Sequence, residues 1–318
     1  MLDSFKIGHY TDETDGTGAT VILCEKGATG GVCVRGAAPA TRETELLRDG
    51  KTVQSIHAVV LSGGSAFGLE CASGVMDYLY ENGFGYNAGK YKVPIVAGAS
   101  LYDLEYKNFA YPHKKDGYEA AKNAQTDNFS AGNIGAGTGA TVSKLAGMAS
   151  ARKAGLGVQT YRLNNIEIAV IVAVNALGDI VKDGKIILGA QTEDGNYLDS
   201  LRVFAAGSLE LKNQNTTIGC ILTNAKLTKE QANILASLAH DGYALSLSPA
   251  HTMFDGDAVF CMASGSQSVE FNVLTAIIPQ LTAKAVQAAA IPNDNPFLGK
   301  KVNKWLFGVF QKMWRKKR

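Results

Sequence analysis

A hydroxyl nucleophile could lie in the segment NTTIG, where a polar stretch over residues 191–215 gives way to an apolar run. We expect that stretch to be exposed. The hydroxyl of Thr216 follows the carbonyl of Asn215 directly and could attack it, and water would then open the resulting ester. The new amino terminus would carry a nucleophile and an amine that titrates near pH ~8 and can act as its general base. The same threonines also suit the start of a β-strand, because β-branched side chains favour extended backbone.

A pair of carboxylates stands at Asp255 and Asp257, with one glycine between them. Two such groups in one site could orient a hydroxyl and bind an ammonium, and each would shift the pKa of the other. Asp-Gly-Asp is also common in surface turns. The spacing resembles part of a calcium loop, but the apolar residues 258–260 stand where further ligands would be needed.

A glycine-rich stretch covers residues 132–148 and contains GAGTGA at 135–140. It matches a dinucleotide-binding pattern only loosely, because no strand precedes it, and it lacks the Gly-Lys-Ser/Thr of a phosphate-binding loop. We interpret it as backbone that approaches a reacting group closely, with Gly135 and Gly137 as substrate contacts. Lys144 is the only cation in the stretch, either as part of a site or as a solvated surface lysine.

An amide side chain, Asn175, ends the apolar run IAVIVAVN. It could donate to a developing oxyanion, or it could simply start a turn. The five histidines lack paired metal-ligand spacing, and we interpret each as structural. The five cysteines include no CxxC pair and are expected to be buried thiols. The sequence therefore predicts neither a metal site nor a cofactor.

The elements that must position these residues alternate between strands and helices. Three features are sharp: two hairpins with turns at residues 164–165 and 183–184, a helix that begins at Thr228 with a capping box, and a helical pattern that contains Pro279. We expect Gly242 to end the first helix and Pro279 to kink or split the second. Strands are expected at 19–24, 57–61 and 93–97. The mixture favours a layered α/β fold over a parallel doubly wound sheet.

Composition sets further bounds. The apolar fraction of 46% supplies ample material for a core, and the net charge is +2. Residues 304–318 hold six lysines and arginines and no acid, so the remainder is net acidic and does not indicate a nucleic-acid binder. The amino-terminal residues do not resemble a secretory signal, and no apolar run has the length of a membrane span, so we expect a cytoplasmic protein.

Six motifs occur in order: VRGAAPATRETELL, LSGGSAFGLE, GNIGAGTGA, VNALGDIV, NTTIGCILTNA and HTMFDGDAVF. Together they resemble the family of L-aminopeptidase/D-amidase-esterases, β-aminopeptidases and nylon-oligomer hydrolases, over nearly the whole chain. The resemblance implies a precursor that cuts itself into two associated chains. It also implies a four-layer α-β-β-α sandwich, similar to N-terminal-nucleophile hydrolases but with different connectivity, and a homo-oligomer, commonly a tetramer of the two-chain unit.

The resemblance also implies roles for single residues. Cleavage would fall between Asn215 and Thr216, giving an α chain (1–215) and a β chain (216–318), with Thr216 as the nucleophile. Asn175 matches the amide that supports the oxyanion. Further matches are the acidic positions, the lysine that ends the glycine-rich loop and a pocket tyrosine: Asp255, Asp257, Lys144 and Tyr102. A threonine nucleophile follows the nylon-oligomer branch, so simple aminopeptidase specificity is not implied.

We expect one autoprocessed catalytic domain over residues 1–291 and a basic amphipathic extension over 292–318. The extension could contact a membrane surface weakly, or pack as an ordinary terminal helix. The favoured hypothesis is a self-cleaving amidohydrolase for small peptides or amides; L-amino-acid, D-amino-acid, β-peptide and ω-amino-acid substrates all remain open. Two alternatives are an acyltransferase of related fold, such as an ornithine acetyltransferase, and a non-catalytic ligand-binding protein.

Overall fold

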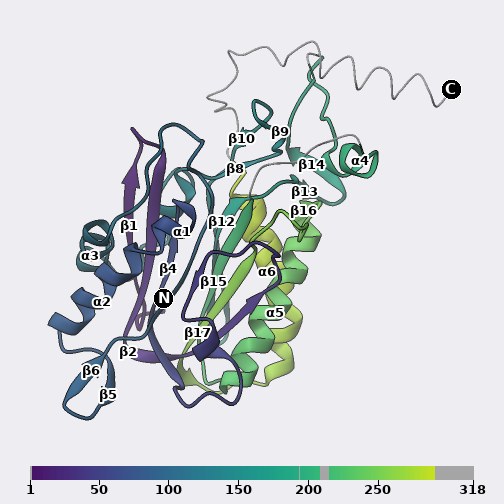
Figure 1. Cartoon of the computed structure of the whole chain (residues 1–318). Helices are drawn as coiled ribbons and strands as arrows, with labels where there is room; N and C mark the ends of the chain where they lie inside the picture. Colours follow the sequence, from purple (N-terminus) through teal and green to yellow (C-terminus); the bar gives the residue numbers. More distant parts are fainter. Residues whose placement is uncertain (1, 193, 208–214, 291–318) are drawn as a thin grey trace.

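The computed structural model describes residues 2–192, 194–207 and 215–290, and its centre is a nine-stranded mixed sheet (Figure 1). The strand order is β11, β12, β15, β17, β2, β4, β7 and β3, and β1 pairs with β2. Their bounds are β1 (Lys6–Asp12), β2 (Thr17–Val34), β3 (Thr41–Arg42), β4 (Ser55–Ser62), β7 (Val96–Ser100), β11 (Leu156–Leu163), β12 (Ile166–Asn175), β15 (Thr216–Ala225) and β17 (Ala258–Gln267).

Strand β2 belongs to both β layers. Its first half pairs with β1 and β4, its last six residues pair with β17, and the β2–β4 register shifts between Leu23 and Ala28. Side chains alternate along a strand. Val21 and Leu23 therefore face one helical layer, whereas Ile22 and Cys24 face the space between the β layers.

Helices cover the two outer faces (Figure 1). Helices α2 (Cys71–Glu81) and α3 (Lys114–Lys122) pack on the β1–β2–β4 side, and α5 (Lys229–Ser246) and α6 (Phe271–Ala288) on the β12–β15–β17 side. A third apolar cluster lies between the β layers and contains residues of β2, β4, β12, β15 and β17. The expected four-layer α-β-β-α sandwich is confirmed.

The predicted local signals are largely confirmed. Both hairpins form, with positive φ at Asn164, Asp183 and Gly184, as two-residue turns of this hand require. The side chains of Thr228 and Gln231 make the reciprocal capping box of α5. Strands include 19–24 and 57–61, whereas the strand expected at 93–97 is displaced: β6 ends at Val93 and β7 begins at Val96.

Two expected helix ends do not occur. Helix α5 continues past Gly242 to Ser246. A Cβ on Gly242 would lie 2.5 Å from the carbonyl oxygen of Pro279, so the glycine permits close packing of α5 on α6. Pro279 does not split its helix, since α6 is one continuous element from Phe271 to Ala288. The alternative, a kink at Pro279, stays a prediction.

Shorter elements complete the described chain. They are η1 (Glu45–Leu47), α1 (Ser65–Gly68), β5 (Tyr86–Ala88), β6 (Tyr91–Val93), η2 (Gly135–Gly137), β8 (Thr141–Val142), β9 (Leu145–Met148), β10 (Arg152–Lys153), β13 (Asp179–Lys182), β14 (Lys185–Leu188), α4 (Ser200–Ala205) and β16 (Leu247–Ser248). No helix among the described residues is long and apolar enough to cross a membrane. The extension at 292–318 lies outside the described residues, and the expected domain division stays a prediction.

Candidate active site

Thr216 is the first residue of β15, and strand order brings Asn175 to it. The two residues are register partners in the antiparallel β12–β15 ladder. Side-chain alternation places Thr216 on the same face as Ile218, toward the space between the β layers. Two residues that the sequence indicated separately therefore meet at one end of that space.

The peptide group before Thr216 is buried and held on both sides. Asn215 is 0% exposed and Thr216 4%, so the expectation of an exposed Asn215 was wrong. The Asn215 N–H donates to the Phe254 carbonyl (2.9 Å), because Asn215 forms a parallel bridge with Asp255. The Asn215 carbonyl oxygen accepts from the Gly256 N–H (2.7 Å) and from the Thr216 hydroxyl (2.5 Å).

Residue 256 has no room for a side chain. A Cβ at this position would lie 2.5 Å from the Ala38 carbonyl oxygen and 2.9 Å from Thr216 Oγ1. The glycine of the Asp-Gly-Asp motif thus lets the backbone approach the hydroxyl directly.

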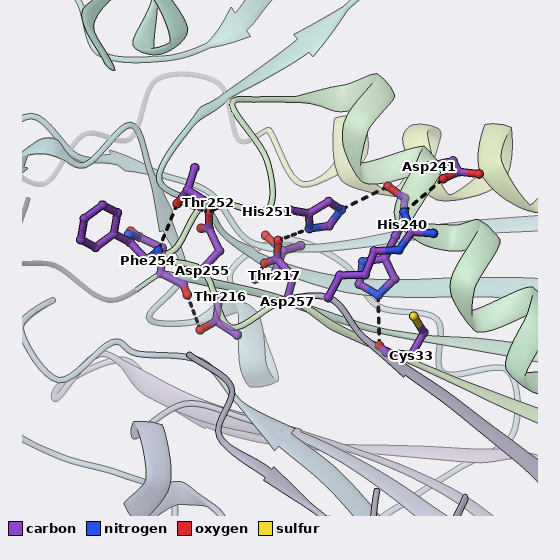
Figure 2. Close-up of polar contacts among 12 residues, drawn as sticks. Cys33, Thr216, Thr217, His240, Asp241, His251, Thr252, Phe254, Asp255 and Asp257 are labelled. Carbon is purple, nitrogen blue, oxygen red and sulfur yellow. Dashed lines mark hydrogen bonds and ion pairs between the residues drawn. The ribbon is translucent and has the colours of Figure 1, made fainter. Parts of the chain in front are cut away.

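The two carboxylates bind different groups (Figure 2). Asp255 Oδ2 accepts from the backbone N–H of Thr252 (2.8 Å) and from its hydroxyl (2.6 Å). Asp257 accepts from the Thr217 N–H through Oδ1 (2.7 Å) and faces His251 Nδ1 through Oδ2 (2.7 Å). Burial, and then the charge of Asp257, raise the pKa of Asp255 to about 6. The motif is a buried acidic pair rather than a surface turn.

Lys144 is a buried lysine, so the alternative of a solvated surface residue was wrong. Its Nζ donates to Asn175 Oδ1 (2.7 Å) and to the Asn175 carbonyl oxygen (3.1 Å). Burial lowers the pKa of Lys144 to about 7, against the opposing charges of Asp255, Asp103 and Glu105. The lysine can therefore exchange a proton near neutral pH.

The Asn175 side chain connects three segments. Its oxygen accepts from Lys144 and from the Thr141 N–H (3.0 Å), and its Nδ2 donates to the Tyr102 carbonyl oxygen (2.9 Å). The amide is held in a fixed orientation beside Thr216. Its role as an oxyanion donor stays a prediction.

A small, partly enclosed pocket, called the cavity below, adjoins this cluster. Tyr102, the expected pocket tyrosine, lines it. The other lining residues are Asp103, Glu105, Tyr106, Thr141, Lys144 and Met148. The cavity therefore opens onto the Lys144 side of the site.

Gly135 and Gly137 are not lining residues of that cavity. A Cβ on Gly135 would meet Thr20 and His9, and one on Gly137 would meet Leu156. Because they lack side chains, these glycines can pack closely against β1, β2 and β11. The expected substrate contact stays a prediction.

Three contributors escaped the sequence interpretation. His251 was interpreted as structural, yet it contacts Asp257 directly. Asp103 and Glu105, which follow the predicted Tyr102, line the cavity. The available signal was closeness in the sequence: Asp103 and Glu105 follow Tyr102, and His251 precedes the acidic pair. No cluster of three metal-ligating His, Cys, Asp or Glu side chains occurs in the described part of the chain.

Comparison with known proteins yields one family. The model described as peptidase family S58 matches residues 3–294. An uncharacterized aminopeptidase of Mycobacterium leprae is 35% identical over 289 residues, covering 83% of this chain and 78% of the relative. A 6-aminohexanoate-oligomer endohydrolase of Paenarthrobacter ureafaciens is 32% identical over 269 residues, covering 82% and 72%.

A solved structure confirms the fold class. The L-aminopeptidase D-Ala-esterase/amidase from Ochrobactrum anthropi, described as a variant of the N-terminal-nucleophile hydrolase fold, matches with a TM-score of 0.66. Sequence identity is 17%, over 93% of this chain and 87% of that one. A β-aminopeptidase from Burkholderia gives a TM-score of 0.64 at 16% identity, over 90% and 84%.

Proposed function

The chain belongs to peptidase family S58 and is a hydrolase of peptide or amide bonds, and on this premise we propose that it cuts itself between Asn215 and Thr216. The liberated Thr216 then serves as its nucleophile. One observation carries the proposal: the Asn215 carbonyl oxygen accepts hydrogen bonds from the Thr216 hydroxyl and the Gly256 N–H. The attacking group and a donor for the developing negative charge therefore meet at one bond.

Self-cleavage would proceed through an ester. Thr216 Oγ1 attacks the Asn215 carbonyl carbon, and the negative charge that develops on the carbonyl oxygen is stabilised by the Gly256 N–H. The bond between that carbon and the Thr216 nitrogen breaks, and the hydroxyl proton ends on the nitrogen. Water then hydrolyses the ester, which leaves a carboxylate on Asn215 and a free amine and hydroxyl on Thr216.

Substrate hydrolysis would use the same hydroxyl. The Thr216 amine takes the hydroxyl proton as Oγ1 attacks a substrate carbonyl, and Asn175 and Lys144 stabilise the oxyanion. The pKa of Lys144, lowered to about 7 by burial, suits a group that adjusts its charge during the reaction. Asp255 and Asp257 balance its charge and orient Thr216, and water releases the acyl group.

The substrate class is a small peptide or amide. Relatives include aminopeptidases and 6-aminohexanoate-oligomer hydrolases, so the panel should span L- and D-amino-acid anilides, β-peptides and ω-amino-acid oligomers. We also propose that the two cut chains stay associated, that these units form a cytoplasmic homo-oligomer, and that Tyr102, Gly135 and Gly137 contact the substrate.

A denaturing gel with intact-mass measurement tests the central step. The wild-type protein should give two bands, with the smaller one beginning TTIGC, and Thr216→Ala should give one full-length band. Thr217→Val is the matched control, because the Thr217 hydroxyl is buried and has no hydrogen-bond partner among the described residues. An intact, folded wild-type chain would overturn the proposal.

A further inference from the structure

An imidazole contacts the acidic pair directly (Figure 2). His251 Nδ1 is 2.7 Å from Asp257 Oδ2, and the other oxygen of this carboxylate accepts from the Thr217 N–H. The carboxylate is 2% exposed and the imidazole 19%. Asp257 thus connects His251 to the peptide group that follows Thr216.

Both ring nitrogens of His251 face oxygen acceptors. Besides the Asp257 carboxylate at Nδ1, the His240 carbonyl oxygen lies 3.4 Å from Nε2. A neutral imidazole carries one N–H and can satisfy one of these acceptors, whereas an imidazolium satisfies both. The geometry therefore fits the cationic ring.

The surroundings of His251 include charges of both signs. Burial acts to lower its pKa, but the hydrogen bond and charge of Asp257 and the His240 carbonyl outweigh it, so that the pKa of His251 is raised. Arg35 opposes this effect, although its guanidinium also contacts Asp241. The rings of His240 and Tyr243, both on α5, pack against the imidazole of His251, with ring centroids 4.9 and 6.1 Å from its own.

A cation at this point relieves an electrostatic conflict. Asp255 and Asp257 are both buried beside one peptide segment, and two adjacent carboxylates resist ionising together. A positive charge on His251 lies 2.7 Å from the Asp257 carboxylate and partly offsets the negative charge beside Asp255. It also holds this carboxylate in the orientation in which it accepts from the Thr217 N–H.

We propose that His251 is a positioning residue, whose imidazolium fixes the orientation of the Asp257 carboxylate and thereby holds the start of β15, with Thr216, in place for reaction. This inference rests on the proposed self-cleavage. The contribution of His251 is present while the ring is protonated and is lost as the pH rises through its pKa. Self-cleavage should therefore weaken on the alkaline side of that pKa.

Two substitutions separate the hydrogen bond from the charge. His251→Asn can place an amide N–H where Nδ1 lies, and asparagine tolerates the left-handed backbone of residue 251 (φ 55°). It should keep part of the self-cleavage rate but lose the alkaline decline. His251→Ala should cleave about 10-fold to 100-fold more slowly, the range expected for a lost charge-assisted hydrogen bond. His113→Asn, at an exposed histidine, is the control.

Cleavage is followed on gels between about pH 5 and 9, with folding checked by circular dichroism. Wild-type rates and pH dependence in both His251 variants would overturn the proposal. If His251→Ala fails to fold, His251→Asn decides alone. This variant keeps the hydrogen bond but lacks the titrating charge, so an alkaline decline that persists in it would overturn the proposal.

A second measurement does not depend on cleavage. In uncut Thr216→Ala protein, the ring ¹⁵N resonances of His251 should report an imidazolium to higher pH than the ~6.5 of a free histidine, and Asp257→Asn should lower that midpoint. A neutral ring below pH 6.5, or no effect of Asp257→Asn, would refute the role of His251. An uncut wild-type chain in which the His251 midpoint is raised as expected would instead refute the proposed self-cleavage.

Discussion

Asn175 faces Thr216 directly across the β12–β15 ladder, whereas the Asn215 carbonyl is held by the Gly256 N–H. The two oxyanions of the proposed chemistry therefore have different donors. In the proposed mechanism, self-cleavage would rely on the backbone of the Asp-Gly-Asp segment, and substrate hydrolysis on the Asn175 amide. This division allows the two reactions to be separated by mutation.

Asn175→Ala should still cut itself but should hydrolyse substrate about 10²-fold to 10³-fold more slowly, the usual loss for one oxyanion donor. It should also destabilise the fold by about 1–3 kcal/mol, because the buried Lys144 loses an acceptor. Gel analysis, anilide kinetics and thermal unfolding measure these effects. Asn224→Ala is the control, since Asn224 makes comparable hydrogen bonds near the far end of β15. Equal losses in both reactions would contradict the division.

Gly256→Ala should have the opposite profile. The added Cβ would meet the Ala38 carbonyl and Thr216 Oγ1, and it would move the N–H away from the Asn215 carbonyl. We expect self-cleavage to slow by ~10²-fold or more, measured as the fraction of cut chain over time. Gly265→Ala adds backbone strain at a φ of +79° but meets no atom within 4 Å, so it controls for destabilisation without a new contact at the site. A Gly256→Ala protein that cuts at the wild-type rate would exclude this donor.

Lys144→Met should flatten the alkaline rise in stability. Burial lowers the pKa of Lys144 from 10.5 to about 7, so between these values the unfolded chain binds more protons than the folded chain. The free energy of unfolding therefore increases with pH across this window. Lys153, with a pKa also lowered to about 7 by burial, contributes in the same direction, so only part of the slope should disappear. Urea unfolding at several pH values tests this, with the exposed Lys122→Met as control; an unchanged slope contradicts it.

Asp255→Asn should remove an acidic limb from the hydrolysis profile. Burial and Asp257 raise the pKa of Asp255 to about 6, so wild-type activity that requires the carboxylate should rise with pH through that value. Stability should move the other way, because between 3.8 and about 6 the folded chain binds the extra proton and loses it as pH increases. Initial rates from about pH 4 to 8 provide the measurement, with Asp77→Asn on α2 as control. Persistence of the limb in Asp255→Asn would assign it to another group.

Local sequence signals predicted local structure well and the assembly of the site less well. The capping box of Thr228 and the hairpin turn at Asp183-Gly184 depend on neighbouring residues, and both are confirmed. Gly242 lies inside α5, where it packs closely on α6, and Pro279 lies inside an unbroken α6, so neither residue ends its helix. Asn215 was expected to be exposed because it ends a polar stretch. Its burial follows from the bridge to Asp255, which lies far away in the sequence.

The same limit applied to single side chains. The family resemblance suggested Lys144 and Asn175, but their hydrogen bond and the depth of burial follow from the fold. His251 lies only six residues before Asp257, yet without the turn between them nothing in the sequence paired the two.

The strand order has a consequence for the cut molecule. β15 and β17 follow the proposed scission point, but they lie between β12 and β2, which precede it. Two strands of the shorter fragment would thus lie in the middle of the sheet, with backbone hydrogen bonds to the longer fragment on both sides. Separating the fragments would break these central hydrogen bonds, so the cut chain should keep its fold and behave as one unit.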